Sequence, residues 1–217
     1  MIILQHGWGF DHHTWDNWLE EIQQQDELML ANRGYFQQTP ADYSLKEKLQ
    51  THTAIVHGFG LHLLPLRLLS ALQKLVIISG FDEFHPQSYS ERVQSERMVE
   101  RMLKQIERSP SVVLQEYRRS AFYPLIPEEQ STRTFNTHLL FEDLSLLNRY
   151  KLRPHLLKKI PEIIILHGER DKLVPVRKAE YLHQLLPGSK LAINDEAGNM
   201  LPVTHQEWCL RTIYDKN

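Results

Sequence analysis

Short apolar runs alternate with longer amphipathic stretches along most of the chain. The short runs are bounded by glycine, proline or polar residues and predict about six strands: Met1–Gln5, Leu28–Ala31, Thr53–His57, Leu75–Ser79, Glu162–Leu166 and Lys190–Ile193. Apolar residues at helical spacing predict helices from about Thr14 and over Leu61–Leu72, Val176–Leu186 and Glu207–Tyr214. Strands that alternate with helices predict an α/β fold whose mostly parallel sheet is covered on both faces.

The interval between the fourth and fifth predicted strands has a different pattern. Its first half places apolar residues at near-helical spacing, at Val93, Met98, Met102, Leu103 and Ile106, and three prolines (Pro110, Pro124, Pro127) divide the rest into several helices. We therefore predict that residues 1–86 and 154–217 form an α/β core. Residues 87–153 are predicted to form a helical cap, or lid, over the carboxyl edge of the sheet, where open α/β sheets bind ligands.

Composition narrows the class of protein. The chain has 217 residues and a formal net charge of -2, which suits one sizeable core and argues against general binding to nucleic acid or membrane surfaces. Its single cysteine, Cys209, excludes an internal disulfide framework and predicts a buried, unreactive thiol in the last helix. The sequence shows no basic leader and no apolar stretch of about 18 residues. We therefore expect a cytoplasmic protein.

The segment Ala54–Leu64 reads as a strand, a tight turn and a helix. In the nucleophile-elbow pattern G-x-S-x-G, such a turn lifts a serine hydroxyl above the end of a parallel sheet. The five corresponding positions read Val56-His57-Gly58-Phe59-Gly60. Only the last glycine matches, and Gly58 stands at the serine position, where glycine adopts a positive φ without steric cost. Pro65 is expected in the first turns of the helix that follows.

Four motifs follow one another in a recognisable order. They are His6-Gly7-Trp8-Gly9, the elbow at 56–60, HGERDKLVP at 167–175, and EAGNMLP at 196–202. Together with the helical insertion, they resemble the α/β-hydrolase family over nearly the whole chain. The HGWG opening is similar to that of esterases that demethylate pimeloyl-carrier-protein methyl esters in biotin synthesis.

The resemblance implies a catalytic triad of serine, aspartate and histidine. Asp171 matches the position of the acid, whereas Gly58 stands at the nucleophile position and Asn199 at the histidine position. The resemblance also implies that the backbone N–H groups of Trp8 and Phe59 form an oxyanion hole, with Trp8 as a wall of an acyl pocket. No cofactor is expected.

Two of the three reacting groups are therefore replaced. Glycine has no side-chain nucleophile, and an asparagine amide does not accept a proton near neutral pH. His57 precedes Gly58 but is expected to point away from the site, so it is not expected to serve as the base. Ser79 and Asp82 follow the fourth strand, where Asp171 already fills the role of the acid, and His205 is expected to begin the last helix.

Three interpretations stay open. The chain is a carboxylesterase scaffold whose sequence has been disabled for triad hydrolysis but still binds an acyl or ester ligand, or a natural non-catalytic protein that uses the same pocket for binding or regulation. Changes confined to the two reacting positions, with Asp171 and the flanking turns retained, favour the first. Different chemistry in the same cavity is the third, and no convincing base supports it.

Partner predictions rest on charge and on the sheet edge. Residues 144–161 carry five basic and no acidic side chains: Arg149, Lys151, Arg153, Lys158 and Lys159. A basic rim could receive an acidic acyl carrier protein or its phosphopantetheine arm, although a solvated surface is the simpler interpretation.

Adjacent His12 and His13 lack a third ligand at metal-site spacing, so no metal centre is expected. An exposed sheet edge would allow a dimer contact.

Overall fold

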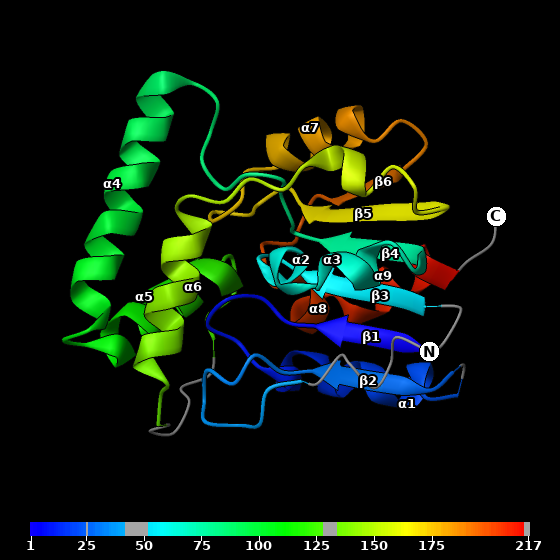
Figure 1. The fold of residues 1–217 in the computed structure, drawn as a ribbon, viewed down its shortest axis with the longest axis horizontal. Helices are drawn as coiled ribbons and strands as arrows, with labels where there is room; N and C mark the ends of the chain where they lie inside the picture. The colour runs from blue at the N-terminus through cyan, green and yellow to red at the C-terminus, as the bar shows by residue number, and fades with distance from the viewer. Residues whose placement is uncertain (25, 42–51, 128–133, 215–217) are drawn as a thin grey trace.

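The computed structural model describes residues 1–24, 26–41, 52–127 and 134–214. Six parallel strands form one sheet in the order β2-β1-β3-β4-β5-β6 (Figure 1). Their bounds are Ile2–Gln5 (β1), Leu28–Ala31 (β2), His52–His57 (β3), Leu72–Ile78 (β4), Glu162–Gly168 (β5) and Lys190–Asn194 (β6). The predicted α/β class and the six strands are confirmed.

Alternate residues of the central strands point to opposite faces of the sheet, and both faces are buried. Ile77 belongs to one apolar cluster, and its neighbours Val76 and Ile78 belong to the other. Figure 1 shows α2 (Gly60–Leu63), α3 (Leu66–Leu69) and α7 (Arg177–Leu185) over the first face. The second face is covered by the 3₁₀ helix η1 (His12–Trp18) and by α1 (Leu19–Ile22), α8 (Leu201–Thr204) and α9 (Gln206–Tyr214). Burial on both faces explains why the strand sequences read as continuous apolar runs.

Three helices cover the carboxyl end of the sheet: α4 (Tyr89–Ile106), α5 (Pro110–Phe122) and α6 (Thr137–Leu147) (Figure 1). Pro110 occupies the first turn of α5, where its missing N–H costs no helical hydrogen bond. The Asn136 side chain caps α6 by accepting from the N–H of Leu139. The three helices fall within residues 87–153, the range that we propose as the cap. A short 3₁₀ helix, η3 (Pro154–Leu156), leads back to the sheet.

Buried polar contacts fasten α6 to the core. The guanidinium of Arg33 donates two hydrogen bonds to the Asp143 carboxylate, at 2.7 and 2.8 Å, and the Tyr35 hydroxyl donates a third at 2.7 Å. The indole Nε1–H of Trp8 donates to the carbonyl of Leu140 at 2.9 Å. These contacts join the loops after β1 and β2 to the cap and fix the height of α6 above the sheet.

Two local predictions were wrong. Leu61–Leu72 is not one helix, because Pro65 has extended backbone (φ -58°, ψ 136°) and separates α2 from α3. Leu72 then begins β4, three residues before the predicted start of that strand. The proline follows the first turn instead of lying within it, so it breaks the helix. The helix expected from Thr14 begins as a 3₁₀ helix capped by Asp11, and α8 had no prediction at all.

Candidate active site

The turn after β3 has the backbone geometry of a nucleophile elbow. Gly58 has a φ of +52°, and its N–H donates to the carbonyl of Ile78 at 2.9 Å. A Cβ built on Gly58 would meet no atom within 4 Å, so a side chain at this position would have open space. The elbow therefore retains the conformation and the room that a nucleophile requires, without carrying one.

Gly60 plays a different part in the same turn. A Cβ at this position would lie 2.7 Å from the carbonyl oxygen of His6 and 2.8 Å from that of Gln5. Only glycine lets the start of α2 approach the end of β1 this closely. The second glycine of the elbow is thus a packing requirement, which is independent of the side chain at position 58.

Asn199 lies between Asp171 and His57. Its Nδ2 donates to Oδ2 of Asp171 at 2.8 Å, and its Oδ1 lies 3.1 Å from Nε2 of His57. Burial lowers the pKa of His57 to about 4, so the ring is neutral near pH 7. The neutral ring donates from Nε2 to the asparagine oxygens, which leaves Nδ1 without a partner among the described residues. Both ends of the Asn199 amide are therefore used within the protein.

Hydrogen bonds hold the Asp171 carboxylate in the way expected of the acid in a triad. Its Oδ1 accepts from the backbone N–H groups of Leu173 and Val174, at 2.8 and 2.9 Å. Burial raises the pKa of Asp171. The rise is opposed by the nearby His167, by the hydrogen bonds from those two N–H groups and by the hydrogen bond from Asn199. The acid and its asparagine partner are thus assembled, and the proton-accepting imidazole is the missing part.

The two N–H groups expected to form the oxyanion hole remain free. Among the described residues, none accepts a hydrogen bond from the backbone N–H of Trp8 or of Phe59. Both residues are buried, and both line a cavity together with Gly58 and Asn199. A ligand carbonyl or carboxylate can therefore occupy the place that these donors leave open.

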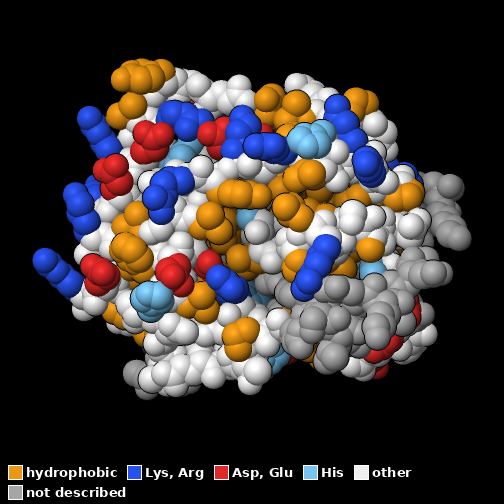
Figure 2. Space-filling model, viewed as in Figure 1, with side chains coloured by type: hydrophobic (Ala, Val, Ile, Leu, Met, Phe, Trp, Pro, Cys, Tyr) orange, Lys and Arg blue, Asp and Glu red, His pale blue; other side chains and the backbone are white. Residues whose placement is uncertain are grey.

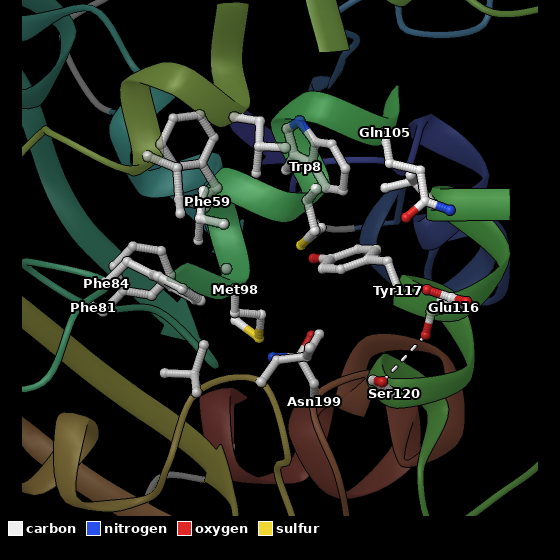
Figure 3. Close-up of a pocket in the computed structure, with 18 residues that line it drawn as sticks. Trp8, Phe59, Phe81, Phe84, Met98, Gln105, Glu116, Tyr117, Ser120 and Asn199 are labelled. Atoms are coloured by element: carbon white, nitrogen blue, oxygen red, sulfur yellow. Dashed lines mark hydrogen bonds between the residues drawn. The ribbon is translucent and has the colours of Figure 1, made fainter. Parts of the chain in front are cut away.

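The cavity has a volume of about 190 Å³ and lies between the elbow and the cap helices (Figure 3). Figure 3 shows Phe81 and Phe84 on one side, and Gln105, Glu116 and Ser120 on the opposite side next to Tyr117. Burial, together with the Asp171 charge, raises the pKa of Tyr117, so its hydroxyl is neutral. The volume is below the range of roughly 300–1,000 Å³ that suits drug-sized ligands, which favours a small one.

Other candidates from the sequence do not line this cavity. Ser79 has a φ of +52° and is fully buried, and its Oγ donates to the carbonyl of Asn199 at 2.9 Å, so it supports the asparagine turn. His57 is buried against the HGWG loop, with its Nδ1 3.0 Å from where a Cβ of Gly7 would stand. Cys209 is buried, as predicted, and burial raises its pKa. Among the described residues, no three His, Cys, Asp or Glu side chains could hold a metal ion.

None of the five basic residues between positions 144 and 161 lines the cavity. Lys151 pairs with Glu83 at 3.0 Å, whereas Lys158 and Lys159 line a separate groove at the amino ends of β5 and β6. Figure 2 shows basic and acidic side chains mixed over the cap.

No described helix is long and apolar enough to cross a membrane.

Sequence reasoning missed the cap side of the cavity. Tyr117, Met98 and Phe84 line it, together with Gln105, Glu116 and Ser120. Helical spacing indicated an apolar face on the segment around Met98, but periodicity does not say whether such a face meets a core or an empty space.

No protein-family model matches the chain, and no curated protein matches its sequence. Solved structures, however, do match the structure of the chain. An esterase from Exiguobacterium antarcticum is 17% identical, with a TM-score of 0.78 over 98% of this chain and 89% of that one. A bromoperoxidase from Bacillus anthracis is 17% identical, with a TM-score of 0.76 over 99% and 91%. MenH from S. aureus is 14% identical, with a TM-score of 0.75 over 98% and 91%.

At these identities the likeness establishes the fold and nothing finer. The parallel six-stranded sheet and its flanking helices match those of α/β-hydrolase structures. The chain therefore has the α/β-hydrolase fold.

Proposed function

We propose that this protein binds a small acyl or ester ligand in the cavity between the elbow and the cap, and that it does not hydrolyse the ligand through a triad. One observation carries the proposal: an intact elbow with free N–H groups on Trp8 and Phe59 opens into an apolar cavity, while Gly58 and Asn199 replace the reacting groups. The scaffold is that of a carboxylic-ester hydrolase. The groups that would bind a ligand are present, and the serine and histidine that would react with it are not.

The hydrogen-bond network supports the absence of turnover. A base must accept a proton from a nucleophile or from water, and the Asn199 amide cannot do so. Its Nδ2 donates one of its two hydrogens to Asp171 and its Oδ1 accepts from His57, so the amide is held in one orientation. His57 is buried and does not line the cavity. We therefore assign it a structural role under Asn199.

The HGWG motif suggests where to begin the search for a ligand. Its similarity to the carrier-protein methyl ester esterases of biotin synthesis makes a pimeloyl methyl ester the first acyl group to test. An acyl carrier protein would then be a partner, and the cytoplasm the place of binding. A natural binding or regulatory protein that uses the same pocket is the second candidate, because both the Nδ2 and the Oδ1 of Asn199 have partners within the protein.

Binding is tested by calorimetric titration with dimethyl pimelate and with shorter methyl esters. The protein as it stands should bind at least one of them, and p-nitrophenyl acetate should show no hydrolysis above buffer. Gly58→Leu should weaken binding by at least about 10-fold, because the side chain would project into the open space above the elbow.

Gly188→Leu is the matched control. Gly188 also has a positive φ, +104°, and no atom within 4 Å of a built Cβ, but it lies in the loop between α7 and β6 and lines a different groove. Binding that Gly58→Leu and Gly188→Leu affect equally would place the ligand outside the elbow. Saturable ester hydrolysis by the unmodified protein would overturn the claim of inactivity.

A further inference from the structure

We propose that the cavity selects ligands that carry a quaternary ammonium group, held against Trp8, Tyr117 and Glu116. This inference rests on the proposed function, since it concerns the chemistry of the ligand bound in the same site. It adds a charge preference that neither the fold nor the elbow implies.

The aromatic content of the cavity is the first observation. Five of the 18 lining residues are aromatic: Trp8, Phe59, Phe81, Phe84 and Tyr117. Trp8 and Tyr117 meet edge to face, with ring centroids 4.9 Å apart and an angle of 87° between the rings. Two rings at a right angle form a corner, and a cation in that corner contacts the negative face of at least one ring.

The formal charge of the cavity is the second observation. Among the described residues of the lining, Glu116 is the only charged one, so they include an acid and no base. No described residue forms an ion pair with its carboxylate. The neighbouring Arg118 places its guanidinium over the rings of Phe10 and Phe122, 5.4 Å from each centroid. An unpaired acid at the mouth of an apolar cavity attracts cations and repels carboxylates.

The scarcity of hydrogen-bond acceptors selects among cations. A primary ammonium has three N–H donors that must be satisfied when it leaves water. The lining is mostly carbon, with its polar side chains gathered around Gln105, Glu116 and Ser120 (Figure 3). The backbone carbonyl of Glu116 is one acceptor that is already engaged, by the Ser120 hydroxyl at 3.1 Å. A quaternary ammonium has no N–H to satisfy, so it loses less on entering this cavity.

Three acetate esters of similar size test the preference, because the cavity of about 190 Å³ requires small probes. Acetylcholine carries the cation, 3,3-dimethylbutyl acetate is its neutral isostere with carbon in place of nitrogen, and 3-acetoxypropanoate carries an anion. In calorimetric titrations at low salt, acetylcholine should bind about 5- to 30-fold more tightly than the neutral isostere. The anion should bind more weakly than either.

Two variants assign the preference to residues. Glu116→Gln should reduce the ratio of cation to isostere affinity by about 2- to 5-fold, and Tyr117→Leu should reduce it by a similar factor. Glu100→Gln is the matched control, because Glu100 is an exposed acid on α4 that does not line the cavity. Glu100→Gln should leave the ratio unchanged.

The outcomes separate this inference from the proposed function. If the neutral isostere binds and acetylcholine gains nothing over it, or if the anion binds most tightly, the charge preference is wrong and the acyl-binding function stands. If no ester of either set binds, the proposed function itself fails. An equal loss of the ratio in Glu116→Gln and Glu100→Gln would assign the effect to net charge and overturn the role of Glu116.

Discussion

The turns at the carboxyl ends of β3, β5 and β6 are built differently from the cap helices above them. In the turns, backbone meets backbone: a Cβ on Gly60 would lie 2.8 Å from the carbonyl of Gln5 in β1, and one on Gly168 would overlap the carbonyls of Ala197 and Gly198. In the cap, side chains make the contacts, and only Val99 and Ile106 are buried in the 18-residue helix α4.

The core turns hold the site in place, whereas the cap side chains select its ligand. Backbone packing fixes the turns that carry Gly58, Asp171 and Asn199. The cap supplies Tyr117, Glu116 and other side chains that can be exchanged without moving the backbone of the turns. The geometry of the site therefore belongs to the core, and its selectivity belongs to the cap.

The largest expected effect comes from restoring the reacting groups to the core turns. Gly58→Ser with Asn199→His should raise hydrolysis of p-nitrophenyl acetate from the buffer rate by at least about 100-fold, because an intact triad contributes several orders of magnitude. Gly58→Ala with Asn199→His is the control, since it lacks only the hydroxyl. A folded double variant no faster than this control would show that the core has lost its catalytic geometry.

Acid should destabilise the core around the elbow. Burial lowers the pKa of His6, His57 and His62 to about 4 each, against 6.5 in the unfolded chain. The unfolded state therefore binds more protons in this range, and stability present above pH 6.5 is lost as the pH falls towards 4. With three such groups, the free energy of unfolding should fall by up to about 4 kcal/mol for each pH unit of acidification in this range.

Urea unfolding between pH 7.5 and 5 measures this slope. His62 stacks on Phe59, with 15° between the rings, so His62→Phe preserves the stacking and should remove one proton from the slope. A stability that stays constant down to pH 5 would contradict the neutral, buried state of these histidines.

Breaking the contact between cap and core should have the next largest effect. Asp143→Ala leaves Arg33 and Tyr35 without their buried acceptor and should lower the free energy of unfolding by about 2–4 kcal/mol, because the partial exposure of Arg33 moderates the cost. Asp195→Ala, at an exposed acid, is the control. Hydrogen exchange should accelerate in α6 and stay slow in β3. Equal acceleration in both would mean that the cap and core do not unfold separately.

The smallest expected effect distinguishes the two glycines of the elbow. Gly60→Ala places a methyl group against the carbonyls of Gln5 and His6 and should cost about 3 kcal/mol of unfolding free energy. Gly58→Ala meets no atom within 4 Å, so only its positive φ costs energy, about 1–2 kcal/mol. Urea denaturation of the two variants measures the difference, and the reverse order would contradict the packing role of Gly60.

Much of the core could be predicted from sequence because its signals are local. Buried parallel strands are continuous apolar runs, and the buried strand Ile2–Gln5 was predicted to within one residue. Pro65 shows the limit of such reasoning: its sequence position fitted the first turns of a helix, and tertiary packing instead placed it between α2 and α3. Local propensity is a weak guide where the chain must turn to reach the next strand.

The candidate site divides in the same way. The sequence alone determined the order of the six strands along the chain, and it identified Gly58, Asp171 and Asn199 as the positions to compare, because motif spacing is carried by the chain itself. Only the tertiary structure decided that Asn199 bridges Asp171 and His57, and that the space above Gly58 is open. Only it brought Tyr117, on a helix with no motif, against Trp8, and placed Glu116 of the same helix in the lining of the same cavity. Contacts across such sequence distances depend on how the helices pack, which no local pattern records.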